Sequence, residues 1–387
     1  MMLVGFNYPW PANRYITIGP NLAPRGEPQP WTRDTKMLEN FKILKNAGVT
    51  VVRMWLMGDG ANYDGTVTFN IKKQSWDFEP PERVHHSFLD DFRALLTICE
   101  SAGMQLIPVL VDFAFFDEPL GDSRGVRGKT NGNYSRGKRA IPSNPAYRRR
   151  FIEGTLEPLL KVAAEKKTVI YAFDVFNEPW WCIAPITGSL FGRSMDKDSL
   201  VAFLSDCTAS VKKFGLKSTI GHRYLSDIIN TFSAIKVDLP QHHYYASLVF
   251  DHLLPQPRSP SLIAPGTTYP RPAKILGEFA SVTKIEYEQL KTQAKNEQDP
   301  KRKQLLEAEL GRLEIQTNYW PELRGRDYDP KTVLEERLKY AEEVGYELAL
   351  FWNEAVDPVK ATVDQIKLAP GKLESVKRFT SKRSKMN

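Results

Sequence analysis

The stretch DVFNEPWW, from Asp174 to Trp181, carries the strongest local pattern in the chain. An apolar run ends there in a polar pair, Asn177 and Glu178, and the proline that follows stops the strand. In a barrel of parallel strands, residues at the carboxyl ends of the strands lie together at one rim. The stretch therefore predicts a buried strand that delivers an amide and a carboxyl group to such a rim.

On either side of this stretch, short β-rich runs alternate with longer amphipathic runs. Eight runs are predicted to be strands: Leu3 to Asn7, Thr50 to Trp55, Gln105 to Asp112, Val169 to Asn177, Ser218 to His222, Val237 to Tyr244, Lys274 to Glu278 and Glu347 to Trp352. Apolar residues at three-four spacing predict helices at Thr35 to Asn46, Ser87 to Ser101, Pro145 to Glu165, Lys197 to Phe214 and Lys331 to Val344. This alternation predicts the α/β class and favours a closed (β/α)8 TIM barrel. An open dinucleotide-binding sheet is disfavoured, because the first strand leads into the aromatic segment Gly5 to Trp10 and not into a Gly-rich turn.

No linker or internal repeat divides the chain, so we expect a single barrel domain over residues 1–387. Two long insertions interrupt the regular spacing, Asp117 to Asn144 after the third strand and about Ser281 to Tyr328 after the seventh. Within the second, Tyr287 to Gln316 predicts a charged helical hairpin broken near Asp299-Pro300. This helical insertion either shapes one end of a cleft or is a solvated surface excursion.

The composition is that of an ordinary globular protein, since 42% of the 387 residues are hydrophobic and 26% are charged. The formal net charge of +7 could favour an acidic partner. However, the two denser basic patches, Arg124 to Arg139 and Lys377 to Lys385, lack interleaved aromatic residues and a recognisable binding motif. We interpret them as a solvated loop and tail, and expect no nucleic-acid partner.

Three cysteines, Cys99, Cys182 and Cys207, share no metal-type spacing, which argues against a disulfide framework or a zinc site. Nothing in the sequence requires a metal or another cofactor. No apolar run reaches membrane-spanning length, so we expect no membrane partner. Because the first residues lack the features of a signal peptide, the chain as it stands is expected in the cytoplasm, or outside the cell if a leader has been removed.

A second apolar run, Lys274 to Ala280, also ends in an acidic residue, Glu278. Counted along the chain, Glu178 and Glu278 end the fourth and seventh predicted strands, so a barrel would bring them to the same rim. Paired carboxyl groups suit the cleavage of glycosides, in which one protonates the leaving oxygen and the other attacks the anomeric carbon. Aromatic neighbours such as Trp181 would raise the pKa of Glu178, as a general acid requires. Asn177 can donate a hydrogen bond to a substrate hydroxyl.

These motifs resemble those of clan A glycoside hydrolases, particularly family 5 and its cellulase-like relatives, over nearly the whole chain. In that clan an Asn-Glu-Pro motif ends strand four and a Gly-Glu-type motif ends strand seven. The resemblance implies that Glu178 is the acid/base, that Glu278 is the nucleophile, and that the anomeric configuration is retained. It also implies that Arg53, in the second strand, steadies the nucleophile.

The resemblance assigns further residues near the carboxyl groups. At strand six, His243 and Tyr245 match a His-x-Tyr element whose Tyr would bond the nucleophile, although strand alternation leaves His242 and Tyr244 as the alternative pair. Trp352 matches the indole beneath the cleaved sugar. Further candidate sugar platforms are Trp10, Trp55, Trp180 and Trp181, and Tyr8 is also expected to face the cleft. At strand three the chain departs from the family pattern, since Asp112 stands where an Asp/His-type element is common, and Asp112 could replace a substrate contact.

The sequence therefore predicts a retaining glycoside hydrolase that cleaves β-linked glucan, mannan or related oligo- and polysaccharides by double displacement. Two alternatives on the same barrel are a carbohydrate-binding pseudoenzyme and a transglycosylase. A phosphosugar isomerase or lyase is disfavoured, because the segments after strands seven and eight lack a Gly-rich phosphate site. The identity of the sugar, the linkage, endo or exo action and the oligomeric state are left open.

Overall fold

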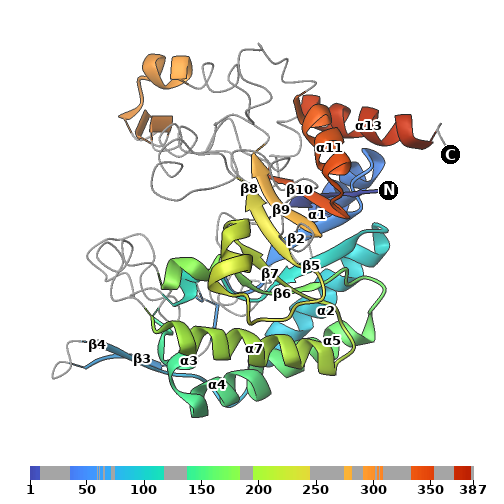
Figure 1. Ribbon diagram of the computed structural model, residues 1–387. Coiled ribbons are helices and arrows are strands. Elements are labelled where there is room, and N and C mark those ends of the chain that lie inside the picture. The colour runs from blue at the N-terminus through green and yellow to red at the C-terminus, as the bar shows by residue number, and fades with distance from the viewer. Residues whose placement is uncertain are drawn as a thin grey trace.

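Eight parallel strands close into a barrel at the centre of the protein (Figure 1). The computed structural model describes residues 1–8, 35–58, 60, 62–63, 66–70, 75–116, 137–183, 195–244, 274–280, 291–300, 303–304, 306–307, 333–352 and 370–384. The barrel strands are β1 (Leu3–Asn7), β2 (Val51–Trp55), β5 (Gln105–Val109), β6 (Phe173–Asn177), β7 (Ser218–His222), β8 (Gln241–Tyr244), β9 (Ile275–Ala280) and β10 (Leu348–Trp352). They follow the order β1-β10-β9-β8-β7-β6-β5-β2, and β2 pairs with β1. The predicted (β/α)8 barrel and its eight strands are confirmed.

Three of these strands, β5, β6 and β8, are shorter than the sequence predicts by more than one residue, and β8 begins at Gln241 instead of Val237. β5 ends at Val109 and β6 begins at Phe173, so Asp112 and Val169 lie outside regular pairing. Asp112 nevertheless forms an isolated parallel bridge with Asn177. The backbone thus holds Asp112 beside the end of β6, although the ladder between the two strands has already ended.

The interior of the barrel changes from apolar to polar along its axis. An apolar cluster consists of Val51, Ile107, Ala172, Leu239, Ile275, Leu348 and Leu350. Because alternate side chains on a strand point to the same face, Arg53 and Trp55 follow Val51 on the inner face of β2. Arg53 is completely buried and Trp55 is 2% exposed. The polar layer therefore lies directly above the apolar cluster, towards the carboxyl ends of the strands.

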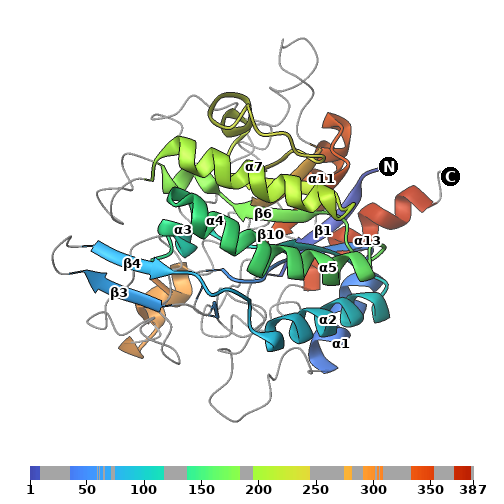
Figure 2. The same cartoon turned by 90° about the horizontal axis from the view of Figure 1, so that it is seen from below.

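Helices cover the outside of the barrel, where α2, α5 and α7 lie side by side (Figure 2). The predicted helices correspond to α1 (Thr35–Asn46), α2 (His86–Ser101), α4 (Pro145–Phe151) with α5 (Glu157–Glu165), α7 (Lys197–Lys213) and α11 (Val333–Val344). Their buried faces contribute Phe92, Leu160 and Leu204 to the main hydrophobic core. In the part of the chain that the structure describes, no helix has the length and apolarity needed to cross a membrane.

A π-helical turn at Ile152–Leu156 divides the predicted helix from Pro145 to Glu165. The turn contains Gly154, where a Cβ atom would lie 2.1 Å from the backbone oxygen of Glu82. The carbonyl of Gly154 accepts the backbone N–H of Val84 at 2.8 Å. The absence of a side chain therefore lets the segment before α2 pack directly on this turn.

We expect Gly154→Ala to lower the free energy of unfolding by about 1 to 3 kcal/mol, because the methyl group would overlap backbone that cannot rotate away. Urea denaturation followed by circular dichroism would measure the change. The neighbouring exposed residue offers a matched control, and Glu153→Ala should stay within about 0.5 kcal/mol of the wild type. Equal unfolding midpoints for Gly154→Ala and the wild type would contradict this account.

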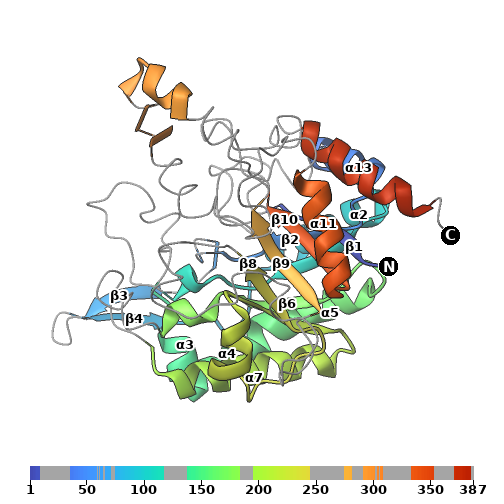
Figure 3. The same cartoon turned by 45° about the horizontal axis from the view of Figure 1, so that its top comes forward.

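Among the described elements that were not predicted from the sequence, two of the longer ones lie on opposite sides of the barrel (Figure 3). One is an antiparallel hairpin of β3 (Thr66–Asn70) and β4 (Ser75–Glu79), and the other is helix α13 (Pro370–Ser384). The interpretation of Lys377 to Lys385 as a tail is wrong for residues 377–384, which belong to α13, although Lys377 and Lys382 are exposed to solvent as expected. This helix packs on α11 and buries Phe379.

The other basic patch, Arg124 to Arg139, is described only at residues 137–139. Here the expectation of a solvated loop is wrong for Lys138, which is fully buried. Its ammonium lies 5.2 Å from the ring centroids of both Phe78 and Phe115. Aromatic faces attract a cation electrostatically, which offsets part of the cost of burying the charge.

The two predicted insertions fall largely outside the described residues. Of Ser281 to Tyr328, residues 291–296 are helical. Of Asp117 to Asn144, the described part includes the short helix α3 (Ala140–Ser143). The helical insertion and the single-domain organisation therefore stay predictions.

Candidate active site

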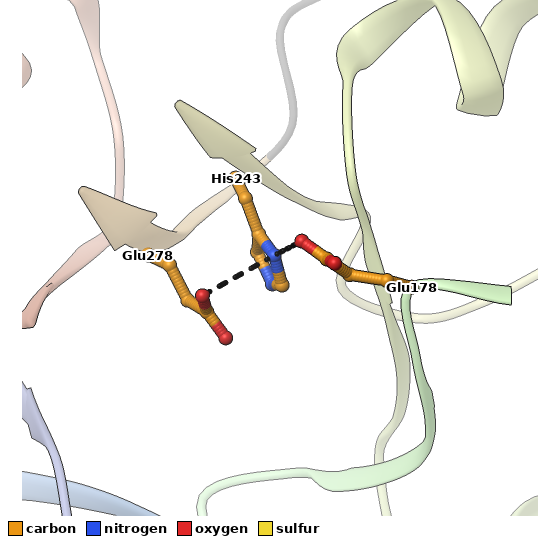
Figure 4. Close-up of side chains that lie close together, drawn as sticks. All are labelled: Glu178, His243 and Glu278. Carbon is orange, nitrogen blue, oxygen red and sulfur yellow. Dashed lines mark hydrogen bonds and ion pairs between the residues drawn. The ribbon is translucent and has the colours of Figure 1, made fainter. Parts of the chain in front are cut away.

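Two glutamates and a histidine meet at the carboxyl ends of barrel strands (Figure 4). Glu178 follows β6, His243 belongs to β8 and Glu278 belongs to β9. The Nδ1 atom of His243 lies 2.7 Å from Oε1 of Glu178 and 3.6 Å from Oε2 of Glu278. One oxygen of each glutamate and a ring nitrogen of the histidine all lie within 4.8 Å of one another. The fold thus brings together the two carboxyl groups that the sequence singled out.

Glu178 has a backbone conformation that is unusual for a residue with a side chain. Its φ is 54° and its ψ is 55°, and it is the only described residue other than glycine with a positive φ. Its N–H donates to the carbonyl of Gly221 at 2.7 Å, and Pro179 then begins a 3-10 turn, Pro179–Cys182. Such a conformation costs about 1 to 3 kcal/mol and occurs preferentially at functional sites. The turn aims the carboxyl group at His243.

We expect Glu178→Gly to be more stable than Glu178→Ala by about 1 kcal/mol, because glycine adopts a left-handed conformation without the steric cost that a Cβ atom brings. Both variants remove the same carboxyl group, so the comparison isolates the backbone. Thermal and urea unfolding would measure the difference. An alanine variant at least as stable as the glycine variant would show that residue 178 is unstrained.

Arg53 connects the nucleophile candidate to the interior of the barrel. Its Nη1 atom donates to Oε1 of Glu278 at 2.7 Å and to Oδ1 of Asn7 at 3.2 Å. Its Nε and Nη2 atoms donate to Oδ2 of Asp174 at 3.0 and 2.9 Å. Burial by itself would lower the pKa of Arg53, but attraction to Asp174 and Glu278 outweighs this effect and raises it. The guanidinium therefore stays charged beside Glu278.

Asp174 anchors this arginine, although we did not single it out from the sequence as a site residue. Its carboxylate accepts the backbone N–H of Gly221 at 3.1 Å and the amide of Gln241 at 3.2 Å, in addition to Arg53. A charged residue in the middle of an apolar strand is seldom buried without a partner, so Asp174 itself was a usable signal. Asn7 and Gln241, which also line the interior, gave no comparable signal.

Gly221 provides the space in which these polar groups meet. A Cβ atom there would lie 2.7 Å from Nη2 of Arg53, 3.0 Å from Nε2 of His243 and 3.1 Å from Nε2 of Gln241. Any side chain at this position would displace the arginine or the histidine. Position 221 needs a glycine because side chains from other strands converge there, and nothing in the local sequence around Gly221 indicates this need.

Asn177 and Asp112 form the other side of the polar layer. Oδ1 of Asn177 accepts from Nη2 of Arg53 at 2.6 Å, and its Nδ2 donates to Oδ2 of Asp112 at 2.7 Å. Asp112 also accepts from the backbone N–H of Ala114 at 3.0 Å and from Nε1 of Trp55 at 3.3 Å. Burial raises the pKa of Asp112 to about 7 against the opposing effect of these donors.

The environment of Glu178 favours its protonated form. Burial raises its pKa, and the hydrogen bond from Nε1 of Trp181 to Oε2, at 2.8 Å, opposes the increase only in part. Burial lowers the pKa of His243 to about 3, so the imidazole is neutral near pH 7. A neutral histidine can accept a hydrogen bond from the protonated carboxyl group of Glu178 or, as the other tautomer, donate one to the carboxylate, so it suits a group that changes its protonation state.

The structure places His243, rather than His242, beside the glutamates. Nε2 of His242 lies 2.6 Å from the hydroxyl of Tyr346, on the side of β8 that faces α11 and its following turn. A register shift between His242 and His243 in the pairing with β9 brings His243 opposite Glu278. Tyr245 and Trp10 lie outside the described residues.

The tryptophans of the site differ in their accessibility. Trp181 is partly exposed and bonds Glu178, and Trp352 is 7% exposed. Trp55 packs edge-on against Trp352 with the ring centroids 5.7 Å apart, and the guanidinium of Arg53 lies 4.4 Å from the Trp55 ring. The expectation of a sugar platform is therefore wrong for Trp55, because its indole is covered and supports the site from below.

Arg223, which follows β7, was also missed by the sequence reasoning. Its guanidinium carbon lies 3.3 Å from the ring centroid of Trp180, and it forms an ion pair with Asp227 at 3.3 Å. Burial raises the pKa of Glu178, and the positive charge of Arg223 opposes part of this rise. Trp180 is partly exposed and therefore remains a candidate platform on the Glu178 side of the site.

Glu178, His243 and Glu278 could also coordinate a divalent cation, since they offer three ligand atoms within 4.8 Å. A cation bound there would compete with the guanidinium of Arg53, which already lies 2.7 Å from Glu278. The donor set thus fits a carboxylate whose charge is balanced by the protein better than one that needs a metal.

The closed barrel carries carboxyl groups at the ends of its fourth and seventh strands, and its fold is similar to that of several solved glycoside hydrolases. The structure is similar to that of a β-1,4-mannanase from the sea hare Aplysia kurodai, with a TM-score of 0.55 and 15% identity over 99% of this chain and 93% of the mannanase. A β-mannanase from the blue mussel Mytilus edulis gives a TM-score of 0.57 and 13% identity, over 97% of this chain and 92% of that one.

A GH5_18 protein from Bifidobacterium longum, solved in complex with Manβ1-4GlcNAc, gives a TM-score of 0.56 and 9% identity, over 99% of this chain and 79% of that one. No protein-family model matches the chain, and no curated protein matches it either. At these identities the likeness is one of fold, and the resemblance inferred from the sequence is supported at that level.

Proposed function

We propose that the protein is a retaining glycoside hydrolase that cleaves β-linked glycans, with Glu178 as acid/base and Glu278 as nucleophile. The observation that carries the proposal is the approach of two carboxyl groups, with oxygens within 4.8 Å, in two different electrostatic environments. Retaining enzymes hold their carboxyl groups about 5 to 5.5 Å apart, whereas inverting enzymes leave about 6.5 to 9.5 Å for a water molecule. The short separation favours retention.

The surroundings of the two glutamates support this division of roles. Glu278 accepts a short hydrogen bond from the permanently charged Arg53, which favours the carboxylate that a nucleophile requires. Glu178 has a raised pKa because it is buried, which favours the protonated form that a general acid requires. This difference within one pair of carboxyl groups is the pattern that assigns acid and nucleophile in other glycosidases.

The reaction would then proceed in two displacements. The carboxylate of Glu278 bonds to the anomeric carbon while the bond to the leaving oxygen breaks, and Glu178 transfers its proton to that oxygen. In the second step a water oxygen attacks the anomeric carbon, the ester bond to Glu278 breaks, and the carboxylate of Glu178 takes the proton from the water. Nδ1 of His243 lies 2.7 Å from Oε1 of Glu178, so the neutral imidazole can accept from the carboxyl group in one tautomer and donate to the carboxylate in the other.

The site and the similar structures together support the choice of substrate class. The partner is a saccharide, and two of the similar structures are β-mannanases while a third binds Manβ1-4GlcNAc. We therefore propose β-mannosidic linkages as the first to test, followed by β-glucosidic ones. Partly exposed Trp180 and Trp181 lie on the Glu178 side, where the leaving group would bind and could stack on an indole.

The test is a panel of aryl β-glycosides, mannan and glucan oligosaccharides, with the anomer of the first-formed product followed by proton NMR. The proposal expects a β-anomer before mutarotation. An α-anomer as the first product would overturn the retaining mechanism. If the protein bound oligosaccharides without cleaving any of them, the hydrolase itself would be refuted.

The pH profile provides a further prediction. Because Glu178 must be protonated in the first step, kcat/KM should fall as the pH rises through the pKa of Glu178, and this basic limb should lie above the ordinary glutamate range because burial raises that pKa. Measured with an activated aryl glycoside, Glu178→Gln should lose the basic limb. The interpretation fails if the limb persists at the same pH in this variant.

A further inference from the structure

Just beyond the end of β5, Asp112 carries a buried carboxyl group that accepts three hydrogen bonds from neighbouring groups. Asp112 is 3% exposed. Its Oδ1 atom accepts from the backbone N–H of Ala114 at 3.0 Å, and its Oδ2 atom accepts from Asn177 at 2.7 Å and from Trp55 at 3.3 Å. A buried carboxylate with three N–H donors has little remaining capacity for a sugar hydroxyl. The expectation that Asp112 replaces a direct substrate contact is therefore not favoured by this geometry.

The hydrogen bond between Asp112 and Asn177 helps to fix the orientation of the Asn177 side-chain amide. Arg53 can only donate, and it bonds Oδ1 of Asn177 at 2.6 Å, while Asp112 accepts from Nδ2. The two bonds together determine which end of the amide is oxygen and which is nitrogen. One N–H of Nδ2 is used by Asp112, and the other has no partner among the described residues.

We propose that Asp112 is a positioning residue that holds the amide of Asn177 so that its second N–H is presented to the 2-hydroxyl of the sugar whose bond is cleaved. The proposal rests on the proposed glycosidase function and extends it to a residue that does not itself touch the substrate. Hydrogen bonds to the 2-hydroxyl strengthen in the transition state of glycoside hydrolysis, so an error in the direction of this N–H would reduce kcat/KM.

Asparagine is the appropriate replacement at position 112 because it has the shape of the aspartate and lacks one acceptor. If its oxygen accepted from Ala114, its own NH2 group would oppose the donors of Asn177 and Trp55. In the opposite orientation the NH2 group would oppose the N–H of Ala114. Neither orientation satisfies all three donors, and a neutral amide oxygen is a weaker acceptor than a carboxylate, so Asp112→Asn should weaken the hold on the Asn177 amide while leaving the packing volume nearly unchanged.

The experiment compares two aryl glycosides that differ only in the presence of the 2-hydroxyl. With the complete sugar, Asp112→Asn should lower kcat/KM by about 10- to 100-fold, as expected for a misplaced contact. With the 2-deoxy sugar, the loss should be less than about 3-fold, because the hydroxyl that Asn177 would bind is missing. The variant Asn177→Ala should show the same selectivity, and adding Asp112→Asn to it should cause little further loss.

A second buried carboxyl group provides the control. Asp227 is 2% exposed and is paired with Arg223, and it makes no hydrogen bond to Asn177 in the described structure. Asp227→Asn should therefore affect the complete and the 2-deoxy substrate to the same extent. If Asp112→Asn lowered kcat/KM equally with both substrates, Asp112 would be a general structural residue and the proposal would be wrong. The proposal would also be wrong if Asp112→Asn had the kcat/KM of the wild type with both substrates.

The failure of the proposed function can be distinguished from the failure of this inference. If the wild type cleaved no glycoside, the hydrolase would be refuted, and crystal structures of the wild type and Asp112→Asn would then test the positioning of Asn177 directly. The proposal expects the bond between the Asn177 amide and position 112 to be lost in the variant, or to be longer than the 2.7 Å of the wild type. An unchanged amide would overturn it.

Discussion

Replacing Glu278 by alanine is expected to lower kcat/KM by about 10⁴-fold or more, because the variant cannot form the covalent intermediate. The fold should survive, since the residue lies at the end of β9 and the guanidinium of Arg53 keeps its bonds to Asp174. Kinetics with an activated aryl β-glycoside would measure the loss. A matched control is Glu347→Ala, which removes a half-exposed glutamate at the opposite end of the barrel and should leave kcat/KM unchanged.

Adding azide to the two alanine variants distinguishes the nucleophile, Glu278, from the acid/base, Glu178. In Glu278→Ala an azide ion can occupy the space of the lost carboxylate and attack the anomeric carbon once, which gives an α-glycosyl azide. In Glu178→Ala the covalent intermediate still forms, and azide needs no general base to release it, so the product is a β-glycosyl azide. The assignments would be reversed if the two products were exchanged, and the double-displacement mechanism would fail if neither variant formed an azide adduct.

Replacing Arg53 by methionine is expected to lower the free energy of unfolding by about 3 to 5 kcal/mol, because Asp174 would lose the partner of a completely buried ion pair. Activity should fall as well, since Glu278 would lose its charged hydrogen-bond donor. Urea denaturation and steady-state kinetics would measure both effects. Arg53→Lys keeps the charge but cannot reach Asp174, Glu278 and Asn177 together, so it should be intermediate in stability and nearly as poor in activity.

A second substitution tests whether the cost comes from the unpaired carboxylate. Asp174→Asn added to Arg53→Met removes the buried negative charge, and it should recover part of the lost stability without restoring activity. A double variant less stable than Arg53→Met would show that the cost does not come from the unpaired carboxylate. An Arg53→Met variant as stable as the wild type would show that the ion pair contributes little to the fold.

Much of the barrel could be predicted because the spacing of apolar residues along the sequence differs between its strands and its helices. Continuous apolar runs such as the one that ends at Asn177 identify buried parallel strands, and all eight were found. The positions of Glu178 and Glu278 followed, because polar residues at the carboxyl ends of parallel strands share a rim. For His243 the sequence left two alternatives, and a local register shift between β8 and β9, which no periodicity reveals, brings this residue opposite Glu278.

The remaining features depend on contacts between distant parts of the chain. Lys138 belongs to a run of basic residues that suggests a solvated loop, yet its ammonium is buried against two phenylalanine rings. Likewise, α13 is rich in lysine and arginine, and Val376 and Phe379 are buried only because the helix packs on α11. Gly221 is needed only where Arg53, His243 and Gln241 converge.

The pairing of β1 with β10 has a consequence for how the chain is made. Leu3 pairs with Leu348, so one edge of the first strand has no partner until the last barrel strand has been synthesised. At about 5 to 20 residues per second, this interval lasts roughly 20 to 70 seconds. Throughout it, an apolar strand edge is open to pairing with another nascent chain. The ribosome-bound protein should therefore depend on chaperones that shield its N-terminal half, and fragments that end before β10 should aggregate instead of forming a partial barrel.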